Sequence, residues 1–407
     1  MTTTSAVDEA RPSVWGVAAL AALVAAGLGT AGAAGVRGGD FVHLWLGGHA
    51  WIIEGPGGIY DPSVHRALLE QAYSGAVPSE LWAGRNDRFG AFFYPPPAAL
   101  AYGLWGSMPV LLAGTVHAVV SFIGVLFGGL LVARWLRVSS IVALLVVLTT
   151  PAFFHNHVLG QNGGWSFLVL AAAGLALCRG RDVWAGVVLG LLVCKPSWLL
   201  AVFWVPICLG RWRTLAAMLC AASMLCVGSA VMLGPEPWQH WWSLLPGLAA
   251  LSTAGDYPLD LQYSLWGLGR RVLGLGWAGD GLGAVLSAGV CGATMYLLRS
   301  RTGALLQLLA LGWCAASLVN LHLHPYDVTG GVFAVLAVWS VPSARRLAWV
   351  ALGVHHGGQA LEGLTGTGWA VAPATVGLVV AWGALAWVLY SQRHGGLDEL
   401  LPEPTVP

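Results

Sequence analysis

The stretch "GLLVCKPSWLLAVF", residues 190–203, places Lys195, the only lysine among 407 residues, inside an apolar run. An ammonium group in such surroundings costs several kcal/mol unless it is solvated or paired. Pro196 follows, and a proline disfavours the helical conformation of the residue before it and lacks an amide hydrogen. We therefore predict a helix break at Lys195-Pro196, between two short helices near 183–194 and 197–209.

The composition of the whole chain is typical of a membrane protein. Hydrophobic residues make up 57% and charged residues 9%, with a mean hydropathy of +0.73, whereas about 25% of residues are charged in soluble domains. Apolar runs recur from residue 14 to residue 390. We expect an all-α polytopic membrane protein with one transmembrane domain over 14–390 and cytoplasmic tails at 1–13 and 391–407.

The charges and cysteines argue against several other classes. The net charge is +1 and the arginines gather at the ends of apolar runs, so nothing indicates a nucleic-acid partner. The seven cysteines form no CxxC pair or metal-type spacing, and we interpret them as packing residues. The N-terminal residues carry an acidic leader before an apolar run, which favours a retained signal anchor over a cleaved peptide.

The arginine clusters predict the topology, because basic residues at span ends are cytoplasmic. With both termini cytoplasmic, the clusters of arginines at span ends lie inside. A single helix over 183–209 would put Arg179 and Arg213 on opposite sides, whereas two short helices keep both inside and place Lys195 at an outer turn. About twelve spans result, near 14–34, 109–133, 139–153, 164–178, 183–194, 197–209, 214–233, 281–298, 303–320, 328–344, 347–357 and 370–390.

This topology places nearly all polar segments on the outer side. Two outer loops cover 35–108 and 234–280, and the segments "HNHVLGQNGG" (155–164) and "NLHLHPYD" (320–327) face the same side. Arg270-Arg271 depart from the cytoplasmic pattern, and they contact either lipid headgroups or a phosphorylated ligand. The segment "HHGGQALE" (355–362) is interpreted as a glycine-rich connector.

The first outer loop holds a candidate base. Asp40 follows the first span directly, and it either caps the next helix or acts as a general base at the edge of the membrane, where partial desolvation makes a carboxylate more basic. Further on, Asp61-Pro62 is typical of a helix start, and we predict a short interfacial helix with Leu68 and Leu69 facing lipid. "FFYPPPAAL" (92–100) is predicted to be extended, either lining a cavity or connecting two elements.

The segment 155–164 combines amides, histidines and glycines at a predicted helix start. Gln161 and Asn162 stand where a helix N-terminus suits a phosphate, but a hydrated turn capped by Asn162 or a neighbour has the same pattern. No carboxylate or cysteine nearby completes a tetrahedral zinc site with His155 and His157, so we expect no metal.

The segment 320–327 gathers four polar side chains at the end of a span, which favours a site. They are His322, His324, Tyr326 and Asp327. In an extended segment the two histidines point the same way, whereas in a helix they diverge by about 200°.

Taken in order, these pieces resemble glycosyltransferase family 87, polyprenol-phosphate-sugar-dependent enzymes of the membrane C superfamily that include a mycobacterial phosphatidylinositol-mannoside mannosyltransferase. The matching pieces are Asp40-Phe41, "GGIYDP" (57–62), "FFYPPPAAL", the Gly160-Gln161-Asn162 turn, "AGVVLGLLVCKPSWLL" (185–200) and "HPYD" (324–327). Asn162 departs from the family's usual spacing by following Gln161 directly. The His-Leu-His arrangement leaves open whether His322 or His324 is the matching residue.

The resemblance implies a bundle of about twelve helices in a bacterial inner membrane, with the active site on the outer face. A hexose, with mannose the family's best-known choice, would pass from a polyprenyl-phosphate donor to a lipid or glycan acceptor. Asp40 would be the base of an inverting transfer. Lys195, with His322 or His324, would bind the phosphate, while Gln161, Asn162 and Tyr326 would bind phosphate or sugar. No cofactor is expected.

A transporter or flippase of a lipid-linked sugar is the main alternative. It would also place polar residues in the membrane, but it should show inverted repeats and access from both faces. The sequence shows no internal repeat, and its candidate residues gather on one side. The enzyme is therefore the preferred interpretation.

Overall fold

The computed structural model describes residues 40–73, 92–251, 262–300, 304–365 and 373–394. The regular structure in these ranges is helical, without strands, as the composition predicts. The helices are α2 (Phe41–Glu54), η1 (Pro56–Tyr60), α3 (Pro62–Ala72), α5 (Pro96–Gly106), α6 (Val110–Leu136), α7 (Ser140–Thr149), α8 (Pro151–Leu159), α9 (Gly163–Cys178), α10 (Asp182–Gly190), η3 (Leu191–Cys194), α11 (Pro196–Val202), α12 (Trp204–Cys208), α13 (Trp212–Leu233), α14 (Glu236–Leu251), α15 (Leu265–Leu273), α16 (Trp277–Ser300), α17 (Leu305–Val319), η5 (Pro325–Asp327), α18 (Gly330–Trp339), η6 (Pro342–Ala344), α19 (Arg345–Thr365) and α20 (Pro373–His394).

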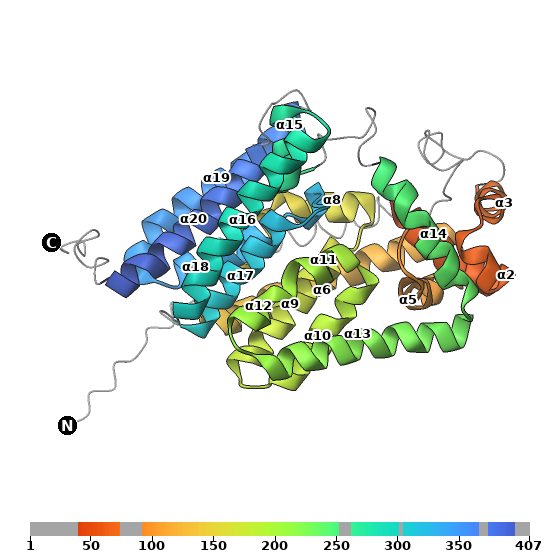
Figure 1. Cartoon of the computed structure of the whole chain (residues 1–407), viewed down its shortest axis with the longest axis horizontal. Helices are drawn as coiled ribbons and strands as arrows, with labels where there is room; N and C mark the ends of the chain where they lie inside the picture. Colours follow the sequence, from red (N-terminus) through yellow and green to blue (C-terminus); the bar gives the residue numbers. More distant parts are fainter. Residues whose placement is uncertain (1–39, 74–91, 252–261, 301–303, 366–372, 395–407) are drawn as a thin grey trace.

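Figure 1 shows how these helices are grouped. The C-terminal helices α16 to α20 lie side by side, and α2, α3, α5 and α14 gather at the opposite end of the molecule. The rings of Trp135 on α6 and Phe167 on α9 both pack on Phe333 of α18, with centroids 5.5 and 5.1 Å apart. Residues from distant parts of the chain thus share one apolar core.

The described residues include four helices long and apolar enough to cross a membrane, namely α6, α13, α16 and α20. Two bent pairs raise the number to six: α7 with α8, at 58°, and η5–α18 with η6–α19, at 119°. Shorter apolar helices lie at 163–178, 182–194, 196–208 and 305–319. The membrane character is supported, and the count of twelve spans remains a prediction.

Some predicted boundaries fall on or near the undescribed parts of the chain. The first predicted span, 14–34, and the tail at 1–13 lie outside the described residues, as does 395–407. Helix α20 ends at His394, so it continues past residue 390, where the transmembrane domain was expected to end.

The predicted break at Lys195-Pro196 is confirmed. Lys195 has φ −136° and ψ 78°, between η3 and the start of α11 at Pro196. The chain that leaves Asp182 returns to it, because the side chains of Arg211 and Thr214 bind the Asp182 carboxylate at 3.4 and 3.2 Å. The segment is a hairpin, and Lys195 lies at the end remote from Asp182.

The described residues between 40 and 108 correct two sequence-based expectations and confirm a third. Leu68 and Leu69 of α3 are buried against α2 rather than facing lipid, because α2 is itself an apolar helix that offers them a protein surface. The stretch after Pro95 is not extended: Pro96 and Pro97 form the first turn of α5, where their missing amide hydrogens are not needed. Asp61 caps α3 as predicted, accepting from the Ser63 amide at 2.7 Å.

The segment 355–362 is also corrected, since it lies within α19 and is not a connector. The Gln359 side chain accepts a hydrogen bond from the Ala152 amide at 2.9 Å, which satisfies the start of α8. The Gln359 side chain is buried between α8 and α19, and this contact stabilises α19 where its sequence contains glycines.

Candidate active site

Two glycines bring three distant segments of the chain together. Gly160, with φ +65°, lies so close to Phe41 that a Cβ atom would come within 2.6 Å of the Phe41 Cβ. A Cβ on Gly163 would meet the backbone carbonyl of Tyr326. Only residues without a side chain allow these approaches. The Asp40-Phe41 segment, the 160–163 turn and the "HPYD" segment therefore meet at one place.

The carboxylate of Asp40 accepts a hydrogen bond from the amide of Gln161, with 3.1 Å between Nε2 and Oδ2. Asp40 occupies the N-cap position of α2, but its side chain makes no capping hydrogen bond. The carboxylate is partly exposed and is directed at the 160–163 turn instead. The capping role considered for Asp40 is therefore not observed, and its role as a base remains a prediction.

Tyr94 extends this contact into the site. Its hydroxyl donates to Gln161 Oε1 at 3.4 Å, so the Gln161 amide group links Tyr94 to Asp40. The Tyr94 carbonyl is held by the Tyr60 hydroxyl at 2.7 Å. Burial, followed by the electrostatic effects of Tyr102, Asp327 and Asp40, raises the pKa of Tyr94 well above its usual range. Tyr94 thus stays protonated and remains a donor, and the "FFYPPPAAL" stretch lines the site.

Lys195 forms an ion pair with Asp327. Its ammonium lies 2.5 Å from Asp327 Oδ1, and the side chains of the two residues are 11% and 1% exposed. The Trp198 indole N–H donates to the same oxygen at 3.3 Å. The second oxygen, Oδ2, is buried and has no hydrogen-bond partner among the described residues. The ammonium also lies 5.2 Å from the ring centroid of Tyr326.

The two histidines point to the same side, as expected for an extended segment. Leu323 between them is buried, and its carbonyl accepts from the Tyr263 amide at 2.9 Å. The Nε2 atoms of His322 and His324 lie 2.6 Å apart, and Gln262 Nε2 lies 3.1 Å from His322 Nδ1. With the Gln262 amide donating to Nδ1, the Nε2–H of His322 donates to His324.

The ring of His324 also stacks on that of Tyr326, at 5.3 Å between centroids. Since Tyr326 adjoins the Lys195 ammonium, the histidines belong to the same site as the ion pair. The structure joins both histidines in one network rather than selecting one of them.

Asn162 occupies the N-cap position of α9 without capping it. That role belongs to Asn156, whose Oδ1 accepts from the Gly164 amide at 3.0 Å. The Asn162 side chain instead adjoins the hydroxyls of Tyr94 and Tyr102, and its Oδ1 is buried without a hydrogen-bond partner in the described part of the chain. Asn162 is therefore available to a polar ligand.

The described residues contain no group of three histidine, cysteine or acidic side chains placed to hold a metal ion. His157 is buried against the Phe122 ring, at 5.0 Å between centroids. The sequence left the partner of Arg270 open, and the structure shows that Arg270 forms an ion pair with Asp280 at 2.5 Å.

The model of glycosyltransferase family 87 matches residues 92–323, more than half of the chain. The chain belongs to glycosyltransferase family 87. It is therefore a glycosyltransferase, which decides against the transporter alternative. No curated protein and no solved structure matches the sequence. The match covers Tyr94, Gln161 and Lys195, whereas Asp40 and Asp327 lie outside it and join the site through their contacts.

The structure brings all seven predicted site residues of this family 87 member into two connected groups. Asp40, Gln161 and Asn162 form one group, with Tyr94; Lys195, His322, His324 and Tyr326 form the other, with Asp327 and Gln262. Sequence reasoning did not include Tyr94 or Gln262 among the site residues, and it grouped Asp327 with the histidines without giving it a role. Tyr94 and Asp327 stand within quoted motifs, but nothing local marks them as partners of Gln161 and Lys195.

Proposed function

We propose that this glycosyltransferase moves a hexose, with mannose as the first candidate, from a polyprenyl-phosphate donor to a hydroxyl of a lipid or glycan acceptor. The transfer takes place at the outer face of a bacterial inner membrane. The observation that carries the proposal is that a positioned carboxylate, Asp40, and a buried ammonium, Lys195, belong to two groups that meet where Gly163 packs on the Tyr326 carbonyl. A base and a phosphate-binding cation are what transfer from a lipid phosphate requires.

Asp40 acts as the general base. Its carboxylate takes the proton of the acceptor hydroxyl while the hydroxyl oxygen forms a bond to the anomeric carbon from the side opposite the phosphate. The bond between the anomeric carbon and the phosphate oxygen breaks, and polyprenyl phosphate leaves with the electron pair. A single displacement of this kind inverts the configuration at the anomeric carbon. The hydrogen bond from Gln161 is made to Oδ2, so Oδ1 is the oxygen assigned to the acceptor hydroxyl.

Lys195 stabilises the charge that develops on the leaving phosphate. An ammonium group has three donors, and one of them is directed at Asp327, so two remain for phosphate oxygens. Asp327 and Trp198 fix the geometry, and such preorganised donors act without reorganisation during the reaction. The His322–His324 pair, in which the His324 ring stacks on Tyr326, supplies a further donor.

The position of the arginines supports the outer face. Arg179 follows the C-terminal end of α9, whereas Gln161 and Asn162 precede its N-terminal end. Sixteen residues separate these ends, about 24 Å at 1.5 Å per residue. If arginines at span ends are cytoplasmic, the candidate site lies toward the other side of the membrane.

The test compares wild type with Asp40→Asn in lipid nanodiscs, using a panel of radiolabelled polyprenyl-phosphate sugars and membrane extract as acceptor. Loss of a general base typically lowers the rate by about 10²–10⁴-fold. Asp61→Asn is the matched control, because it makes the same chemical change at a helix cap where asparagine also serves. Equal transfer by Asp40→Asn and wild type, or no transfer by wild type from any donor, would refute the proposal.

A further inference from the structure

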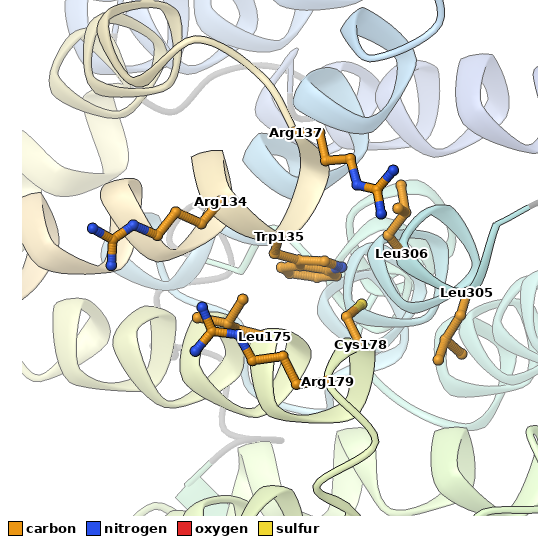
Figure 2. Close-up of a pocket in the computed structure, with 8 residues that line it drawn as sticks. All are labelled: Arg134, Trp135, Arg137, Leu175, Cys178, Arg179, Leu305 and Leu306. Carbon is orange, nitrogen blue, oxygen red and sulfur yellow. The ribbon is translucent and has the colours of Figure 1, made fainter.

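Three arginines line a cavity that the candidate active site does not use. Figure 2 shows the cavity, of about 240 Å³, at the ends of α6, α9 and α17. Arg137 lies on one side of the Trp135 indole, and Arg134 and Arg179 lie on the other. The cavity is at the opposite end of α9 from Gln161, so it is separate from the transfer site.

The charge of these arginines is not balanced by the described part of the chain. None of the three forms an ion pair with a described carboxylate. Asp182, the acidic residue nearest to Arg179 in the sequence, is bound by Arg211 and Thr214. The cavity therefore carries about three positive charges and attracts an anion.

The backbone around the cavity fits the same conclusion. Arg137 ends α6 with φ 55° and ψ 40°, a left-handed conformation that favours glycine, and it is the only described non-glycine residue with positive φ. Helix α17 begins at the cavity with Leu305 and Leu306, and the first amide groups of a helix have no intrahelical acceptor. A helix N-terminus beside arginines is a favourable place for a phosphate.

The apolar side chains among the lining residues favour a lipid as the source of the anion. Leu175, Leu305 and Leu306 line the cavity beside the arginines, and Trp135 lies at its centre. A soluble phosphate gains nothing from such apolar surface, whereas a phospholipid buries its glycerol and upper acyl chain against it. Basic pockets between helix ends on the cytoplasmic side suit anionic headgroups.

We propose that this arginine cavity binds the phosphate group of an anionic phospholipid, with the acyl chains following the apolar walls. The bound lipid joins the ends of α6, α9 and α17. This binding is separate from sugar transfer and does not depend on the donor that the enzyme uses.

The first experiment measures lipid binding by native mass spectrometry and by thermal stabilisation of the purified full chain in neutral detergent. Phosphatidylglycerol is compared with phosphatidylcholine and with soluble glycerol 1-phosphate. We expect saturable binding of phosphatidylglycerol. The variant Arg134→Gln/Arg137→Gln/Arg179→Gln should bind about a hundredfold more weakly, at about fivefold for each arginine.

The matched control is Arg213→Gln/Arg345→Gln/Arg346→Gln, which removes the same charge from exposed arginines outside the cavity. This control should bind phosphatidylglycerol as wild type does. Equal weakening of both triple variants, or no weakening of either, would overturn the proposal. Competition by glycerol 1-phosphate at the same concentration would also overturn it, because the ligand would then be a soluble phosphate.

A second measurement uses wild type alone and so avoids any effect of mutation on folding. Cys178 lines the cavity and is exposed, and Cys220 on α13 is exposed but lies outside it. At about four times its Kd, phosphatidylglycerol should slow the maleimide labelling of Cys178 about fivefold, because occupancy lowers the free fraction by 1 + [L]/Kd, and it should leave labelling of Cys220 unchanged. Labelling of Cys178 that does not respond to phosphatidylglycerol would contradict the proposed site.

Discussion

The pair formed by Lys195 and Asp327 allows the folding role of a buried charge to be separated from its role in transfer. With side chains 11% and 1% exposed and 2.5 Å between the charged atoms, neither group can exchange its partner for bulk water. Removing one partner of a buried pair costs about 3–5 kcal/mol. We expect Lys195→Met and Asp327→Asn each to lose this much stability.

The double variant Lys195→Met/Asp327→Asn should recover most of that stability, because it leaves no unpaired charge in the core. Its sugar transfer should not recover, because the phosphate-binding ammonium is still absent. At about 2 °C per kcal/mol for a long chain, the Tm of each single variant should fall by about 6–10 °C and that of the double variant by much less.

The assay follows Tm in detergent and initial transfer rates in nanodiscs for all four proteins. A double variant as unstable as the two single variants would show that the instability does not come from leaving one buried charge unpaired. A double variant that transfers sugar at the wild-type rate would refute the role of Lys195 at the phosphate and leave only a structural one.

Two further predictions test the assembly and the pH dependence of the fold. Gly163→Ala should lower Tm and transfer together, because its Cβ would meet the Tyr326 carbonyl, whereas Gly289→Ala on α16, with open space around it, should preserve both. Burial lowers the pKa of His65 to about 4 from an ordinary value of 6.5; its folded-state pKa is therefore below the unfolded one, and stability falls as pH drops from 6.5 to 4. The loss of unfolding free energy should reach about 3 kcal/mol. Urea unfolding across this pH range should show a flatter pH dependence of stability for His65→Gln than for wild type. Equal slopes for the two proteins would contradict the role of His65.

Several local features could be read from the sequence because they depend on neighbouring residues. Proline restricts the residue before it, so the break at Lys195-Pro196 was predictable, as was the Asp61 cap of α3. The same local reasoning failed where the tertiary surroundings decided the outcome. Leu68 and Leu69 are apolar residues that suit contact with lipid or with protein equally well. Only the position of α2 shows that they pack on protein.

In the candidate site too, the sequence identified residues but not their contacts. The sequence identified Asp40, Gln161, Lys195 and the histidines as polar groups in an apolar chain, since burying such groups is costly without a purpose. It gave no sign that Gln161 would bind Asp40 or that Asp327 would hold Lys195, because these partners lie 121 and 132 residues apart.

By itself, the sequence determined the membrane character of this glycosyltransferase, its helical class and the arginine pattern that predicts its topology, because hydropathy and charge act residue by residue. Only the tertiary structure decided which polar groups meet. Packing at Gly160 and Gly163 brings the Asp40, Gln161 and Tyr326 segments together, and the ends of three helices enclose the arginine cavity. Such contacts depend on the shape of the whole molecule, which no local pattern carries.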